Sequence, residues 1–173
     1  MKNNELLELF KIPNIVVNVP TLWLLKKSMI DSKLLFNAHL MVRYRAIDDF
    51  YNGRKKWWDI YNEMQKKRVS QNLSIPRDKM DNETSFKKLI CSIEKNGFDY
   101  KYPIVINKNF RLVDGSHRLA LALYFKMEYV PVLIDEKSYD FEKDYSLKWF
   151  IDNGFEYIID DIHSTYNEIV GEK

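Results

Sequence analysis

Four polar residues and a glycine, Asp114 to Arg118, stand between a strand-like apolar segment and a helix-like apolar segment. The local sequence is FRLVDGSHRLALALYF, from Phe110 to Phe125. A plain turn needs only a pair such as Asp-Gly, so the added serine, histidine and arginine indicate a chemical role. Their types fit a binding site for an anion at the start of a helix.

Each residue of this turn would contribute differently to such a site. Gly115 lets a ligand approach the backbone, and Ser116 and His117 come where the first-turn N–H groups and the helix dipole favour an anion. Arg118 can bind two phosphate oxygens, and His117 can donate to another. Asp114 needs a cation or a proton beside phosphate, so it is the candidate Mg²⁺ ligand or proton acceptor. Together they resemble the parts of a phosphoryl-transfer site.

An ordinary structural explanation of the same residues stays open. Asp-Gly is common in hairpin turns, serine is a common helix N-cap, and a neighbouring His-Arg pair can simply lie on the surface. Short motifs of this kind also arise by chance. From the residues alone, the anion site and the ordinary turn are both hypotheses.

The segments around the turn have a regular order of predicted elements. Asn82 is the expected N-cap of a helix that ends at Gly97. Lys108 and Asn109 are the expected turn between the first two strands that follow. The predicted elements after Gly97 are strands at 102–107, 110–113 and 129–134 and a helix at 116–125.

Both ends of the chain show mainly helical periodicity. The predicted elements there are a short strand at 14–19 and helices at 22–30, 33–53, 54–68, 141–151 and 157–170. We expect a mixed α/β (α+β) protein in one compact unit. Its segments would be a helical N-terminal extension (1–70), an α/β core (71–137) and a helical C-terminal extension (138–173). Aromatic residues of the 54–68 helix, Tyr61 among them, are expected to be packing residues.

Composition and charge narrow the function classes. The formal net charge is only +2, with 27 basic and 25 acidic residues, which argues against nucleic acid as the main partner. The basic runs at 54–56 and 65–68 fit a solvated helix face. Cys91 is the single cysteine, so an internal disulfide and a cysteine zinc cluster are excluded. We find no signal peptide and no bilayer-spanning segment, so the expected location is cytoplasmic, without a membrane partner.

The middle of the chain, from about Leu73 to Ile134, carries an ordered set of motifs: IPRDKM, FKKLICSIEKNG, YPIVIN, FRLVDGSHRLALALYF and VPVLI. This set resembles the superfamily that joins ParB N-terminal domains, sulfiredoxin and the free-serine kinases. The resemblance implies a small mixed sheet with helices. It also implies that the phosphates of a nucleotide bind at Gly115, Ser116, His117 and Arg118.

Two branches of that superfamily fit poorly. Sulfiredoxin has a catalytic cysteine in its turn where this chain has Ser116, so sulfinic acid reduction by that mechanism is excluded. ParB proteins have a Glu-Arg-Arg box and a following helix-turn-helix domain. Here the turn is Ser-His-Arg, and the short tail after Ile134 has no helix-turn-helix pattern.

The free-serine kinases offer the closest match. Their Asp-Gly-His-His-Arg type turn resembles Asp114-Gly115-Ser116-His117-Arg118, with the difference at Ser116. That branch also uses an upstream acidic residue to activate the substrate hydroxyl. Asp78 and Glu83 are both candidates for this role, and the spacing does not choose between them.

The expected function is therefore that of a small kinase. ATP, ADP or CTP would bind with Mg²⁺, and a phosphoryl group would pass to a hydroxyl of an amino acid, an amino alcohol or a sugar. The candidate catalytic residues are Asp114, Asp78, Glu83 and His117. The alternative is a nucleotide-binding switch or adaptor without turnover, and a homodimer stays open. A DNA-binding protein using the 54–68 helix, or a nuclease, fits less well.

Overall fold

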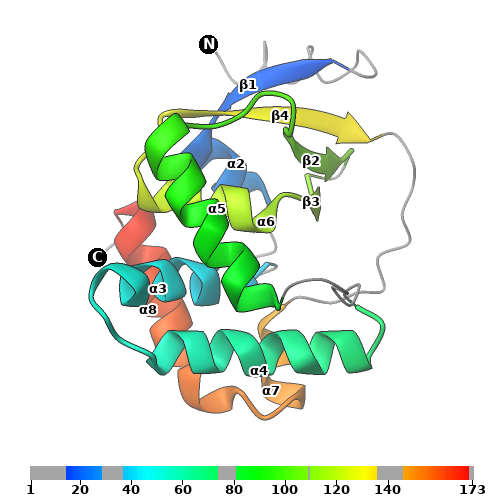
Figure 1. The fold of residues 1–173 in the computed structure, drawn as a ribbon. Helices are drawn as coiled ribbons and strands as arrows, with labels where there is room; N and C mark the ends of the chain where they lie inside the picture. The colour runs from blue at the N-terminus through cyan, green and yellow to red at the C-terminus, as the bar shows by residue number, and fades with distance from the viewer. Residues whose placement is uncertain (1–14, 29–36, 74–80, 109, 136–145, 172–173) are drawn as a thin grey trace.

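A computed structural model describes residues 15–28, 37–73, 81–108, 110–135 and 146–171. In these ranges the chain forms a mixed α/β structure, which confirms the predicted class. Figure 1 shows the sheet along one side of the molecule, at the top of the view, with the helices beneath it.

The sheet has four described strands in the order β1-β4-β2-β3. β4 pairs antiparallel with β1 and parallel with β2, and β2 pairs antiparallel with β3. All four lie where strands were predicted. Their bounds are β1 Val16–Pro20, β2 Ile104–Asn107, β3 Leu112–Asp114 and β4 Tyr129–Asp135.

Strand β1 belongs to the segment expected to be a helical extension. It pairs with β4 along its whole length, from Val16 opposite Leu133 to Pro20 opposite Tyr129. Its side chains alternate, so Val17 is buried while its neighbours are exposed, as a half-buried edge strand requires. The N-terminal segment therefore completes the central sheet.

Seven helices are described in these ranges: α2 Thr21–Ser28, α3 His39–Tyr51, α4 Lys56–Ser70, α5 Asn82–Asn96, α6 Ser116–Tyr124, α7 Leu147–Asp152 and α8 Ile159–Val170. A short 3₁₀ turn, Glu156–Ile158, precedes α8. Each predicted helix is present, with shifts at the ends. The helix predicted to run through 33–53 begins at His39, because Asn37 has a φ of +59° and its amide donates to the carbonyl of Ser28.

The predicted N-cap of α5 is wrong by one residue. Asp81, and not Asn82, has the extended backbone of a cap, and its Oδ1 accepts a 2.7 Å hydrogen bond from the backbone N–H of Thr84. Its Oδ2 also accepts from the Thr84 hydroxyl at 2.7 Å. Asp and Asn cap almost equally well, so the side-chain types of adjacent residues could not decide the position.

Helix α6 is the centre of the packing. Its residues Leu119 to Leu123 are all buried, because the helix contacts the sheet, α2, α3 and α5. Each fully buried leucine contributes about 1.5–3 kcal/mol of hydrophobic free energy. The two small residues between the leucines, Ala120 and Ala122, allow close approach of the neighbouring elements. This burial holds the start of α6 in a fixed place.

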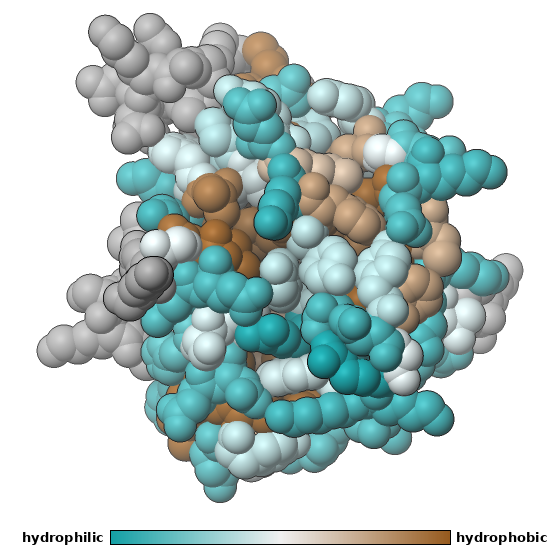
Figure 2. Space-filling model, turned by 90° about the vertical axis from the view of Figure 1, so that its left-hand side faces the viewer, coloured by the Kyte–Doolittle hydropathy of each residue, from teal (hydrophilic) through white to brown (hydrophobic). Residues whose placement is uncertain are grey.

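The surface differs from this apolar interior. The face in Figure 2 is largely hydrophilic, and its hydrophobic side chains form separate patches. Cys91 is exposed on α5. None of the helices in the described ranges combines the length and apolar character that crossing a membrane requires.

Candidate functional site

The polar turn forms the corner between β3 and α6. Asp114 is the last residue of β3, Gly115 is the N-cap of α6, and Ser116 is the first helical residue. Two parts of the ordinary-turn explanation are therefore wrong. Serine is not the cap, and the hairpin turn lies upstream, where the backbone N–H of Asn107 donates to the carbonyl of Arg111.

Gly115 is required at this corner by both conformation and space. Its φ is +93°, a left-handed value that costs other residues about 1–2 kcal/mol. A Cβ at this position would lie 3.1 Å from the Cα of Ile104 and 3.2 Å from Nη2 of Arg118. The backbone of β2 thus passes directly against the glycine.

The N-terminus of α6 has no side-chain cap. Gly115 has no side chain to accept a capping hydrogen bond, and the N–H groups of the first turn belong to Ser116, His117 and Arg118. Partial positive charge gathers at such a helix start and favours an anion. The sequence predicted that phosphate binds at this helix start, and that binding stays a prediction.

Residues of two other helices, α4 and α5, contact the side chain of His117. Its Nε2 lies 2.8 Å from the hydroxyl oxygen of Tyr61, which is fully buried on α4. Its ring meets the ring of Phe86 on α5 at a centroid distance of 4.5 Å. His117 is half-buried, so the explanation of the His-Arg pair as loose surface residues does not hold for it.

Arg118 forms hydrogen bonds with two other segments at the corner between β3 and α6. Its Nη2 donates to Oδ2 of Asp114 and its Nη1 to the carbonyl of Tyr102, both at 2.8 Å. The Arg118 side chain is 16% exposed and that of Asp114 is 71% exposed. A guanidinium has five N–H donors, and these bonds use two of them. The Asp114 carboxylate offsets part of the positive charge of the guanidinium.

A pocket of about 510 Å³ opens over this corner. Phe86, Leu89 and Tyr102 form its apolar wall, and polar side chains line the rest. Asp114 is the one carboxylate among the described residues that line it. The polar lining consists of Asn82, Ser85, Asp114, His117 and Arg118, with the backbone of Gly115.

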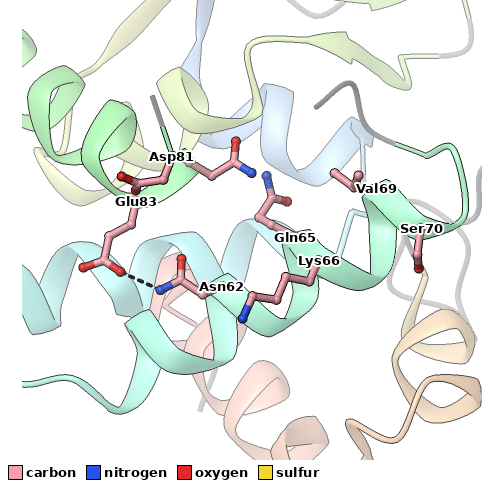
Figure 3. A pocket seen from close by; sticks show the side chains of 8 residues that line it. Asn62, Gln65, Lys66, Val69, Ser70, Asp81 and Glu83 are labelled. Atoms are coloured by element: carbon pink, nitrogen blue, oxygen red, sulfur yellow. Dashed lines mark hydrogen bonds between the residues drawn. The ribbon is translucent and has the colours of Figure 1, made fainter. Parts of the chain in front are cut away.

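Glu83, a predicted catalytic residue, lines a neighbouring pocket of about 620 Å³. Figure 3 shows it at the start of α5, directed at Asn62 on α4. Burial alone would raise the pKa of Glu83, but hydrogen bonds from Lys87 and Asn62 outweigh burial and lower it. The two pockets share Asn82 in their linings. Glu83 therefore lines the pocket next to the one at the 114–118 turn, and its carboxylate already accepts hydrogen bonds from Asn62 and Lys87.

Two further predictions concern Asp78 and the Mg²⁺ site. Asp78 lies outside the described residues. Among those described, no group of three or more His, Cys, Asp or Glu side chains is arranged to hold a metal ion. Mg²⁺ in phosphoryl-transfer sites needs only one or two carboxylates in addition to the substrate phosphates, so exposed Asp114 fits that donor set.

Two buried, positively charged side chains lie on α3 and α4. Arg43 and Arg68 are buried, and each approaches Oε1 of Gln65, at 3.5 and 3.4 Å. The guanidinium carbon of Arg43 lies 5.7 Å from the centroid of the Tyr61 ring. Burial, and then the charges of Arg43, Arg68 and His117, hold the pKa of His39 well below its usual value.

Sequence reasoning missed the contribution of Tyr61 and Phe86 to the site. Tyr61 was expected to be a packing residue, and both residues are buried. One signal could have revealed Tyr61, because a tyrosine inside an apolar helix face must give its hydroxyl a hydrogen-bond partner. The partner, His117, is 56 residues away and could not be chosen from the sequence.

No protein-family model, curated protein sequence or solved structure matched the chain.

Proposed function

We propose that this chain is a nucleotide-dependent phosphotransferase that acts on a hydroxyl of a small polar acceptor. The observation that carries the proposal is the uncapped start of α6, where Gly115, His117 and Arg118 meet in one pocket. The resemblance of residues 73–134 to the ParB and sulfiredoxin superfamily supports the same function and a fold of that type. The turn at 114–118 resembles that of the free-serine-kinase branch.

The pocket offers a separate place for each part of a nucleotide. The first-turn N–H groups and the Arg118 guanidinium would bind the phosphates. The wall formed by Phe86, Leu89 and Tyr102 suits the flat face of a base. Mg²⁺, held by Asp114 and the phosphates, would supply charge neutralisation at the transferred group.

Two residues would assist the transfer, one by accepting the proton of the acceptor hydroxyl and one by stabilising the negative charge of the phosphoryl group. Where Asp114 does not hold the Mg²⁺, it would instead accept the proton of the acceptor hydroxyl, whose oxygen attacks the terminal phosphorus as the bond to the bridging oxygen breaks. Arg118 would stabilise the charge on the transferred group. Asp78 and Glu83 remain proposed alternatives for the proton acceptor.

One observation favours the second candidate, a nucleotide-binding switch without turnover. Asp114 is already paired with Arg118, and Glu83 is bonded to Lys87 and Asn62. The described part of the pocket thus offers no unengaged carboxylate as a general base. Such a site can bind a nucleotide without turning it over.

A nucleotide panel tests binding first. ATP, ADP, CTP and GTP, each with and without Mg²⁺, would be added in thermal unfolding experiments. A nucleotide at a hundredfold excess over its Kd stabilises by about 2.7 kcal/mol, which corresponds to roughly 5–10 °C for a chain of this size. Arg118→Ala should abolish this shift. Arg45→Ala is the matched control, because Arg45 also pairs with a carboxylate, that of Glu168, but outside the pocket.

Turnover separates the two candidates. Mass spectrometry of a mixture of amino acids, amino alcohols and sugars, incubated with the stabilising nucleotide, should show one phosphorylated product. Binding without any product would favour the switch. If no nucleotide raises the Tm, and Arg118→Ala behaves like Arg45→Ala, the phosphate site itself is refuted.

A further inference from the structure

The neighbouring pocket of about 620 Å³ lies between α4 and the start of α5, and we call it the α4–α5 pocket. Residues of α4 line one side of it, and Asp81, Asn82 and Glu83 line the other. The α4 side lies outside residues 73–134, the segment that carries the family resemblance. Asn82 also lines the pocket at the 114–118 turn, so the two pockets adjoin.

Gln65 is the buried polar side chain on the α4 side, with 4% of its surface exposed. Its Oε1 accepts long hydrogen bonds from Nη2 of Arg43 and Nη1 of Arg68, at 3.5 and 3.4 Å. A guanidinium has N–H donors and no acceptor, so the oxygen of the Gln65 amide faces the arginines. The chemistry of its partners therefore fixes the orientation of this amide, with the nitrogen on the other side.

The amide nitrogen of Gln65 is directed into the pocket. Figure 3 shows it pointing from α4 into the space between α4 and α5. Nε2 makes no hydrogen bond with any of the described residues. Buried donors are nearly always paired, because an unpaired one loses its hydration without compensation. The Nε2–H₂ group therefore offers two donors that suit the oxygen atoms of a ligand.

The carboxylates of the pocket are already engaged. Both oxygens of Asp81 accept from Thr84, and Asp81 lies at the positive end of the α5 dipole. Glu83 accepts from Asn62 and Lys87, and the ammonium of Lys87 neutralises its charge. These acidic groups are thus balanced from within the protein.

Two further polar side chains in the lining are not engaged. Lys66 and Asn82 make no side-chain hydrogen bond or ion pair with a described residue. Lys66 therefore brings a positive charge to the pocket that no described carboxylate neutralises. The first-turn N–H groups of α5 add partial positive charge at Asn82. Unused donors and positive charge together favour an anionic ligand.

We propose that the α4–α5 pocket binds the carboxylate of a small polar molecule, with the amide N–H₂ of Gln65 as its buried donor and Lys66 as its counter-charge. Hydrogen bonds to an ionised carboxylate are the stronger kind, which suits a donor held in a buried position. The use of the site rests on the proposed function, because an acceptor bound here would reach the 114–118 turn past Asn82. The acceptor would then carry a carboxylate, which excludes amino alcohols and neutral sugars.

Glycerate, glyceramide and glycerol test the ligand class, because they share their hydroxyl-bearing carbons and differ in one group. That group is a carboxylate, a neutral amide or a hydroxymethyl. Each would be titrated into the chain without nucleotide, and proton–nitrogen NMR would follow the assigned side-chain N–H₂ signals of Gln65. Glycerate should shift these signals and bind about tenfold more tightly than the other two. Equal affinity for glyceramide would overturn the carboxylate, and unmoved Gln65 signals would overturn the site.

Gln65→Glu replaces the N–H₂ donor with an oxygen and keeps an acceptor for Arg43 and Arg68. It should weaken glycerate binding at least about tenfold. Gln71→Glu makes the same change of charge at the end of α4, outside the pocket, and should leave the affinity unchanged. Equal affinities of the two folded variants would refute the role of Gln65. The signals of the unaltered protein decide the site even if Gln65→Glu does not fold.

Lys66→Gln tests the counter-charge at an exposed position of α4. It should weaken glycerate binding about threefold, the effect of an exposed ion pair. Lys88→Gln is the matched control, because Lys88 is exposed on α5 and does not line the pocket. If the two variants bind glycerate equally well, Lys66 is not the counter-charge.

The nucleotide panel separates this site from the proposed function. Glycerate binding is measured without nucleotide, so it decides the α4–α5 pocket whatever the nucleotides do. If glycerate binds and no nucleotide raises the Tm, the phosphate site fails and the carboxylate site stands. Where a nucleotide does bind, the protein saturated with it should still bind glycerate. Mutual exclusion of the two ligands would refute the pocket as an acceptor site.

Discussion

Replacing Gly115 with alanine tests whether the corner between β3 and α6 is as constrained as its geometry indicates. The left-handed backbone, with φ at +93°, costs an alanine about 1–2 kcal/mol. The added Cβ would also lie 3.1 Å from the Cα of Ile104, a backbone atom of β2 that cannot simply rotate away. Overpacking of this kind typically costs about 1–3 kcal/mol. We therefore expect a loss of roughly 3 kcal/mol in the free energy of unfolding.

Gly53→Ala is the matched control for backbone strain. Gly53 has a φ of +63°, and a Cβ there would meet no atom within 4 Å. It should therefore cost only the strain, about 1–2 kcal/mol. Urea unfolding followed by tryptophan fluorescence measures both variants, and the difference between them isolates the contact with β2. Equal losses for the two variants would refute the argument that this backbone contact selects glycine.

Two further substitutions test the local structure that supports the site. Asp81→Asn keeps an N-cap for α5 but removes a titrating group, whose pKa is lowered by hydrogen bonds from the backbone N–H and hydroxyl of Thr84. Because the pKa of Asp81 is lower in the folded state than in the unfolded state, this stabilisation is present above about pH 4 and is lost as the pH falls. Between about pH 5 and 2.5 the urea midpoint should therefore decline less for Asp81→Asn than for the unaltered protein. Parallel curves for the two proteins would contradict this prediction. Asp49→Ala removes the buried carboxylate that accepts from the backbone N–H of Trp57 at 2.7 Å. It should cost about 1–3 kcal/mol in urea unfolding, and a loss below about 0.5 kcal/mol would show that another acceptor replaces it.

Local patterns predicted the elements well because their causes are local. The alternation in β1, the Asp-Gly corner and the stop at Gly97 depend on backbone preferences and on side-chain periodicity. The ends of elements were less certain. At α5, two neighbouring residues of nearly equal capping strength competed, and the hydrogen bonds of Thr84 decided for Asp81.

The sequence by itself determined the candidate turn, its glycine and the positively charged residue of its helix. Those features follow from residue type and short spacing. Only the tertiary structure decided that β1 completes the sheet, that Tyr61 bonds His117, and that Glu83 lines the adjacent pocket. These are contacts between residues distant in the chain, and their formation depends on how buried apolar faces pack together. A local pattern can show that a hydroxyl needs a partner, but packing selects which one it meets.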